Sequence, residues 1–141
     1  MLSAKTRWWQ HVHVSENTPN SVVESPLAGL VSDWLDWKAA AEELGVTVSK
    51  VRQLIREHQL AAAVPAPGVG QQIPAELLQD GAIVKGVPGA LVLLSDGGWD
   101  DVEMLTWLFT ADDSLPGRPI DALRENRGTE VKRRAQVLAL S

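Results

Sequence analysis

Apolar residues recur at helical spacing in two short segments between residues 36 and 58. The first reads WKAAAEEL, is rich in strong helix formers and follows Asp36, whose carboxylate can cap a helix N-terminus. The second reads VSKVRQLIREH, with Ser49 near its cap position. It places four apolar residues on one side: Val48, Val51, Leu54 and Ile55. Gly45 ends the first segment, so the pattern predicts two helices joined by a tight turn.

Short apolar runs around a Pro/Gly-rich turn follow the helix pair. Residues 60–74 read LAAAV, PAPGVGQQ and IP. Two short strands separated by strong breaker residues predict a small β-hairpin beside the helices. Pro74 then allows a short helical turn through AELL.

Helical periodicity returns after residue 85. An apolar helix is expected from Pro88 to the Gly97-Gly98 pair. The next helix has Asp100 at its cap and Glu103 three residues later, which is the pattern of a capping box. Its inner stripe is formed by Val102, Leu105, Leu108 and Phe109.

Two further helices are expected near the C-terminus. Pro119 occupies the first position of PIDALREN, and Gly128 ends that helix. Thr129 is expected to cap the last helix, EVKRRAQVLAL. The inward-facing residues of that helix are Val131, Ala135 and Leu138.

These elements predict a mainly α fold. We expect a winged helix-turn-helix with a small β-wing at residues 33–80, and a C-terminal helical layer packed on it at residues 81–141. Residues 1–32 show little apolar periodicity and contain several Ser, Asn and Pro residues and one Gly, which predicts a disordered N-terminal tail.

Composition narrows the class of protein. The 141 residues include no Cys, which excludes disulfides, thiol catalysis and cysteine zinc sites and favours a reducing cytoplasm. There is no apolar run of about 18 residues and no apolar segment typical of a signal peptide, so we expect no membrane association. Trp34, Trp37, Trp99 and Trp107 lie in periodic segments and are expected to be at least partly buried.

The first two helices meet the requirements of a helix-turn-helix. Ala41 is a small residue where the helices cross, and Gly45 tolerates a left-handed turn. Three apolar residues are expected to lock the helices together: Val46, Val51 and Leu54. The exposed face of the second helix then carries residue types that reach base edges and phosphates: Ser49, Lys50, Arg52, Gln53 and Arg56. A solvated helix face often has a similar composition, so the face alone leaves both interpretations open.

Residues 39–63 followed by Ile73-Pro74 resemble the winged helix-turn-helix of the excisionase and MerR-like group. The resemblance continues through GGWDDVE and WLFTADDSLPGRPIDAL to a small actinobacterial family of winged-helix DNA-binding proteins linked to Ser/Thr protein kinases. It covers about residues 33–139. It implies a DNA-contact role for the recognition-helix residues, double-stranded DNA as partner, and a transcriptional regulator located at the nucleoid in the cytoplasm.

Charge is distributed unevenly along the chain, whose net charge is −5. Residues 47–60 carry a local charge of +2 and residues 127–134 a local charge of +3, whereas residues 96–121 carry −6. If the last helix lies beside the recognition helix, Lys132, Arg133 and Arg134 would extend one basic face. The wing has no Lys or Arg, so its DNA contacts must come from Gln71, Gln72 or backbone amides. This predicts modest affinity, aided by the C-terminal cations or by a homodimer.

Other functional classes have weaker support. His11 and His13 lack a third ligand, so we expect no metal. No catalytic triad, P-loop or dinucleotide fingerprint is present, so we expect neither an enzyme nor a cofactor.

The C-terminal segment offers an alternative function. It also resembles the module with which Xre/ParS-type antitoxins dock a toxin. The matching positions are Trp107, Leu108, Leu115, Pro119, Ile120 and Leu123. They imply either a partner-binding surface or ordinary helix packing.

The N-terminal segment offers a site of control. Thr6 and Thr18 are candidate phosphosites for a Ser/Thr kinase, because phosphate there would add up to about two negative charges and oppose DNA binding.

Overall fold

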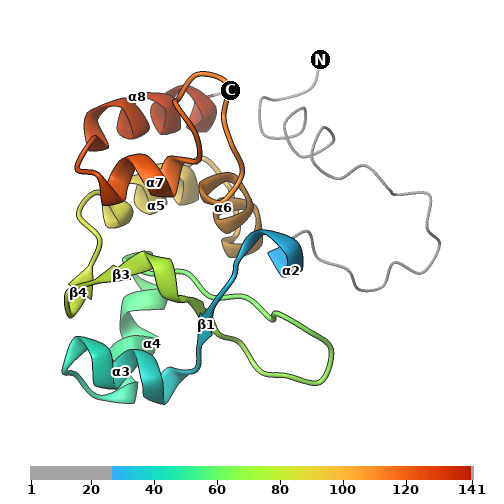
Figure 1. The fold of residues 1–141 in the computed structure, drawn as a ribbon, viewed down its shortest axis with the longest axis vertical. Coiled ribbons are helices and arrows are strands. Elements are labelled where there is room, and N and C mark those ends of the chain that lie inside the picture. The colour runs from blue at the N-terminus through green and yellow to red at the C-terminus, as the bar shows by residue number, and fades with distance from the viewer. Residues whose placement is uncertain (1–26, 141) are drawn as a thin grey trace.

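The computed structural model describes residues 27–140 and shows two helical groups stacked along the longest axis of the molecule (Figure 1). At one end lie α3 (Trp37–Leu44) and α4 (Val48–Arg56). At the other end lie α7 (Pro119–Arg124) and α8 (Gly128–Ala139), with α5 (Val87–Asp96) packed against α8. The mainly helical fold with small antiparallel sheets confirms the predicted fold class.

The local signals that predicted helix ends are largely confirmed. Asp36 accepts a hydrogen bond from the Ala39 amide at 2.8 Å. In α6 (Asp101–Leu108), Asp100 and Glu103 form a reciprocal capping box at 2.9 Å in both directions. Pro119 occupies the first turn of α7. The cap of α8 is different: the helix begins at Gly128, and Thr129 lies inside its first turn.

Two short antiparallel ladders connect the helical groups. β1 (Trp34–Leu35) precedes α3 and pairs with β2 (Ile73–Pro74), with Trp34 opposite Pro74. A 3-10 turn, η1 (Ala75–Leu77), leads into a second hairpin of β3 (Leu78–Gln79) and β4 (Ala82–Ile83). Asp80 and Gly81 join these strands with positive φ angles of 54° and 78°, which suit a two-residue hairpin turn.

The predicted wing is a long loop rather than a regular hairpin (Figure 1). Only Ala63 and Gln72 pair across it, through backbone hydrogen bonds of 3.0 and 2.8 Å. Leu60 to Ala63, most of the run expected as its first strand, are buried, and the Ala62 amide donates to the Asp101 carboxylate at 3.1 Å. Tertiary contacts therefore replace the strand pairing that the sequence predicted.

The predicted tail also ends earlier than expected. The helix α2 (Leu27–Leu30) packs on α6, with Leu27 fully buried and Val31 almost so. A four-residue helix is too short to show apolar periodicity, which explains why the sequence pattern placed it in the tail. The remainder of the predicted tail, residues 1–26, lies outside the described residues.

One continuous cluster of buried apolar side chains runs from α2 to α8. It includes Val51 of the recognition helix and Leu91 of α5. Val131, Ala135 and Leu138 of α8 are buried as predicted, and Trp99 and Trp107 are core residues. The two helical groups therefore share one hydrophobic core.

Candidate nucleic-acid interface

The turn between α3 and α4 is held by backbone geometry. Gly45 adopts a left-handed conformation with φ of 71°. The Val46 amide then donates to the Ala41 carbonyl at 3.0 Å, which is the bond that closes a Schellman-type helix end. Ala41 is buried and Gly45 has open space around it, so the glycine is required by its conformation rather than by crowding.

The sequence predicted that Val46 would lock the two helices together, but in the structure it does not. Its side chain is 36% exposed, because the turn uses its backbone amide and leaves the side chain outside. Of the other two residues predicted for this role, Val51 is fully buried and Leu54 is half-buried, and both contact the core.

Thr47, not Ser49, caps the recognition helix. The Thr47 hydroxyl accepts a hydrogen bond from the Lys50 amide at 3.1 Å. The helix therefore begins earlier than expected, and Ser49 is exposed in its first turn.

The structure places the five predicted recognition-helix residues on the outside of α4. Ser49, Arg52, Gln53 and Arg56 follow the spacing of one helical face, with Lys50 beside them. All are exposed except Gln53, which is half-buried. The opposite side of α4 packs on the core through Val51, Leu54 and Ile55.

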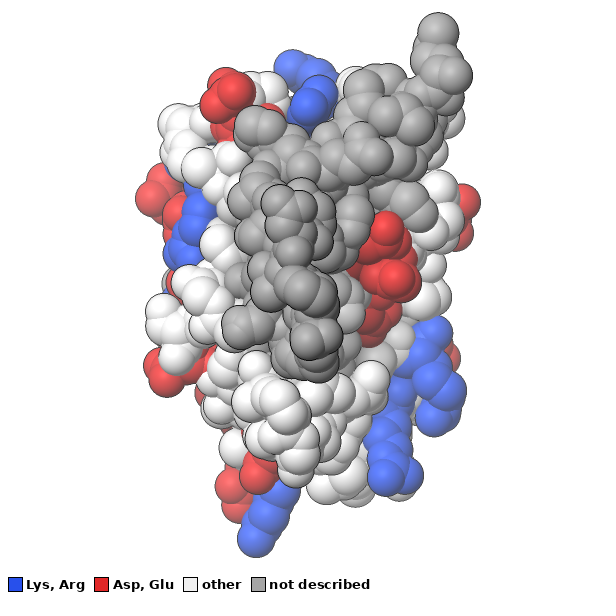
Figure 2. Space-filling view, turned by 90° about the vertical axis from the view of Figure 1, so that its right-hand side faces the viewer, with Lys and Arg blue, Asp and Glu red and all other residues white. Residues whose placement is uncertain are grey.

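The cations of this face have no carboxylate partner among residues 27–140. Lys50, Arg52 and Arg56 form no ion pair there. Arg52 and Arg56 are also one turn apart, where like charges repel. Figure 2 shows Lys and Arg side chains at the end of the molecule where this helix pair lies, below a group of Asp and Glu side chains. These cations are therefore better placed to bind a negatively charged ligand than to stabilise the fold through ion pairs.

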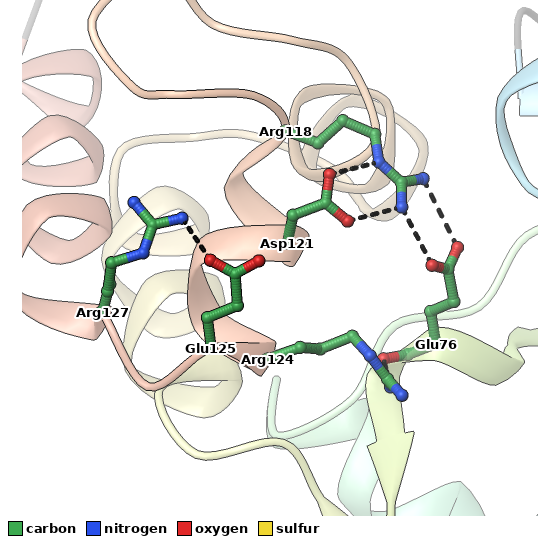
Figure 3. A network of polar contacts seen from close by, with 6 residues as sticks. All are labelled: Glu76, Arg118, Asp121, Arg124, Glu125 and Arg127. Carbon is green, nitrogen blue, oxygen red and sulfur yellow. Dashed lines mark hydrogen bonds and ion pairs between the residues drawn. The ribbon is translucent and has the colours of Figure 1, made fainter.

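The arginines of α7 and its flanks are used differently (Figure 3). Arg118 donates to Glu76 at 2.9 Å and to Asp121 at 2.6 Å, and it lies 5.5 Å from the centre of the Phe109 ring. Arg124 donates to the carbonyls of Glu76 and Leu78 at 2.8 and 2.9 Å. These bonds tie the C-terminal helices to the segment that follows the wing.

Three aspartates of the described residues have pKa values shifted by their surroundings. Hydrogen bonds from Arg118 hold the pKa of Asp121 below its ordinary value. At Asp112, burial opposes ionisation, but hydrogen bonds from Trp107 and Ser114 and the charge of Arg134 together lower its pKa. Burial raises the pKa of Asp101 despite its bond to the Ala62 amide.

The predicted extension of the basic face by α8 is wrong within a single chain. Figure 1 shows α8 and α4 at opposite ends of the longest axis. Lys132 and Arg133 are exposed, but Arg134 forms an ion pair with Asp112 at 3.2 Å. The fold places the two basic segments, residues 47–60 and 127–134, far apart. Counting charges along the sequence does not reveal this separation.

The wing contributes neutral groups. Gln71 is exposed, and Gln72 is half-buried with its backbone engaged in the pair with Ala63. Val64 and Val69 are also exposed on this loop.

Glu57 is a residue of this surface that the sequence did not single out. It follows the last residue of α4, and its carboxylate accepts a hydrogen bond from the Gln53 amide at 3.0 Å. The spacing of four residues between Gln53 and Glu57 is the signal that could have revealed the pair.

Two other predictions concern sites elsewhere in the chain. Among residues 27–140, no group of three or more His, Cys, Asp or Glu residues could hold a metal. His11, His13, Thr6 and Thr18 lie outside the described residues.

No helix within the described range is long and apolar enough to cross a membrane.

The positions that resemble an antitoxin module are buried. These are Trp107, Leu108, Leu115, Pro119, Ile120 and Leu123. They pack within the helical layer, which favours the packing interpretation over a docking surface for a toxin.

A helix pair joined at a left-handed glycine, an exposed cationic second helix and an adjoining loop wing define a winged helix-turn-helix protein of the DNA-binding class. Comparison with known proteins agrees. A family model described as "DNA-binding protein Rv2175c, wHTH domain" matches residues 30–78. A second, "Rv2175c C-terminal domain of unknown function", matches residues 84–139.

The chain belongs to the Rv2175c family. The DNA-binding protein Rv2175c of Mycobacterium tuberculosis (strain ATCC 25618 / H37Rv) is 44% identical to it over 117 residues, covering 74% of this chain and 79% of the relative. The NMR structure of Rv2175c has a TM-score of 0.69 and 40% identity, covering 77% of this chain and 82% of that one.

Proposed function

We propose that this chain is a transcriptional regulator that binds double-stranded DNA with α4 in the major groove. One observation carries the proposal: three cations without a carboxylate partner among the described residues, Lys50, Arg52 and Arg56, lie together on the outer face of α4, the second helix of the helix-turn-helix. The name of the Mycobacterium tuberculosis relative supports the same ligand.

DNA titration at two salt concentrations tests the proposal. Lys50→Ala/Arg52→Ala/Arg56→Ala removes three charges from α4 and should abolish most binding. Three phosphate contacts per chain give a fall in log K of about 2.7 per unit of log salt concentration, and the variant should lose that slope.

A matched control removes the same charge elsewhere. Lys85, Lys132 and Arg133 are exposed, and none forms an ion pair with a described residue. Their replacement by Ala should leave the salt slope unchanged. Equal binding by the α4 variant would contradict the proposal, and loss of binding by the control instead would assign the DNA contact to the C-terminal half.

We further propose that the chain acts on DNA as a homodimer. Three cations on one helix provide limited affinity, and two copies would double the number of phosphate contacts. The expected result is a salt slope near twice that of one chain, together with a dimer–DNA complex in sedimentation velocity. A complex with one chain per duplex would contradict it.

Phosphorylation of the N-terminal segment is the proposed means of control. Each phosphate adds up to about two negative charges and would repel DNA. A Ser/Thr kinase that modifies Thr6 or Thr18 should weaken binding by the wild type and not by Thr6→Ala/Thr18→Ala. Phosphopeptide mapping that finds only sites outside residues 1–26 would rule out this mechanism.

A further inference from the structure

A carboxylate lies on the face of α4 that is otherwise neutral or cationic. Glu57 is exposed at the C-terminal end of the helix, one turn beyond Gln53. Along the helix it lies on the same side as Ser49, Gln53 and Arg56, which is the proposed DNA-facing side.

This position is unfavourable for a negative charge in two ways. The C-terminal end of a helix carries a partial negative charge, so an acidic residue there is disfavoured. A carboxylate near DNA is also repelled by phosphates. No described cation compensates, because Glu57 forms no ion pair within residues 27–140.

The side-chain interaction that Glu57 does make is with the amide of Gln53, at 3.0 Å. A carboxylate can only accept, so it selects the nitrogen side of that amide and turns the carbonyl oxygen of Gln53 away. One of the two amide hydrogens is used and the other remains, together with the carbonyl oxygen.

A free N–H beside a free carbonyl on one Gln amide is the pair that matches N7 and N6 of adenine in the major groove. Fixing the amide before binding removes a rotamer choice and excludes the flipped orientation, which would present the wrong groups. Half-burial of Gln53 restricts it further.

We propose that Glu57 is a positioning residue that orients the amide of Gln53 to read an adenine. The proposal rests on the proposed function, in which α4 occupies the major groove. It assigns specificity to the Gln53–Glu57 pair and general affinity to the neighbouring cations.

Selection from randomised double-stranded oligonucleotides tests the proposal. The wild type should enrich a motif with an adenine at one position. Gln53→Ala and Glu57→Ala should both lose preference at that same position, by roughly ten-fold. The double variant should lose no more than either single variant, because the two residues act as a unit.

Two variants separate positioning from charge. Glu57→Gln keeps an oxygen that can accept from Gln53 but removes the charge, so it should retain the adenine preference. Glu42 is exposed on α3 and its side chain bonds to no described residue. Glu42→Ala makes the same charge change as Glu57→Ala and should also retain the preference.

Several results would overturn the inference. Glu57→Ala could retain every base preference that Gln53→Ala loses, or it could lose a preference at a different position, which would mean that Glu57 reads a base itself. Failure of the proposed function is distinguishable: in that case the wild type enriches no motif, or the Lys50→Ala/Arg52→Ala/Arg56→Ala variant enriches the same one.

Discussion

Gly45 shows how a residue can matter through its backbone conformation alone. A Cβ atom at this position would meet no atom within 4 Å, yet the φ angle of 71° lies in the left-handed region. We expect Gly45→Ala to destabilise the fold by about 1 kcal/mol, because a side chain is strained in that conformation. Urea unfolding measures the change.

Gly89 provides the control for this prediction. It lies within α5, a Cβ atom added there would also meet no atom within 4 Å, and it lacks a positive φ. Gly89→Ala should stabilise the protein by roughly 0.5–1 kcal/mol through helix propensity. If both substitutions had the same sign, the left-handed turn would not be the reason for Gly45.

Asp121 predicts a pH dependence. Arg118 holds its folded-state pKa below the ordinary 3.8, so the unfolded chain binds this proton more readily than the folded chain does. The contribution of Asp121 to the free energy of unfolding is therefore fully present above about pH 4. It is lost as the pH falls through the lower folded-state pKa. The difference in unfolding free energy between wild type and Asp121→Asn should therefore shrink in acid.

Urea unfolding from neutral pH down to about pH 2 measures this difference. Asp113→Asn is the control, because Asp113 is exposed and makes no side-chain bond to a described residue. A wild-type advantage over Asp121→Asn that stayed constant across the range would exclude the proposed linkage.

At the scale of elements, local signals predicted most helices. The caps at Asp36 and Asp100 and the proline at position 119 act within one turn, so the sequence around each contains the whole interaction. The exposed face of α4 follows from the same short-range periodicity. The hairpin at Asp80-Gly81 is not among the predicted elements, although its turn residues are a strong local signal.

Long-range pairings could not be predicted in this way. β1 and β2 have two residues each, which is too few for an alternating pattern. The Ala62 amide meets a carboxylate 39 residues away, and the distance of α8 from α4 depends on the packing of every helix between them. The sequence therefore predicted the residues of the α4 face but not its separation from the second basic segment.

The neutral wing predicts how added charge would act. Gln71 lies on the wing and Gln136 on α8, and both are exposed. Gln71→Lys should steepen the salt dependence of DNA binding by about 0.9 in log–log slope for each bound chain, because each added phosphate contact releases one further counterion. Gln136→Lys should leave the slope unchanged. Equal slopes for both variants would show that the wing does not approach DNA.

At the scale of the whole molecule, the shared core and the Arg118 network predict one unfolding transition. Arg118 and Glu76 are 28% and 29% exposed at their side chains, so the network is only partly screened by solvent. Arg118→Ala should lower the unfolding free energy by about 1–2 kcal/mol and shift the entire transition. Tryptophan fluorescence and far-ultraviolet circular dichroism should report the same midpoint.

Arg127→Ala is the matched control. Arg127 pairs with Glu125 at 2.6 Å, but both residues belong to the same α7–α8 connection and Glu125 is well exposed. Such local pairs contribute less than about 1 kcal/mol. Separate midpoints for the two probes in the Arg118→Ala variant would mean that the two halves unfold independently.

The β1–β2 pairing has a consequence for protein engineering. Trp34 lies opposite Pro74, so the chain enters and leaves the helix pair and wing at neighbouring points. Segments whose ends meet in this way can be exchanged between homologous scaffolds with little strain on the host. Transplanting residues 36–72 into the Mycobacterium tuberculosis relative should therefore transfer base preference as a cassette, while the recipient keeps its own C-terminal helices.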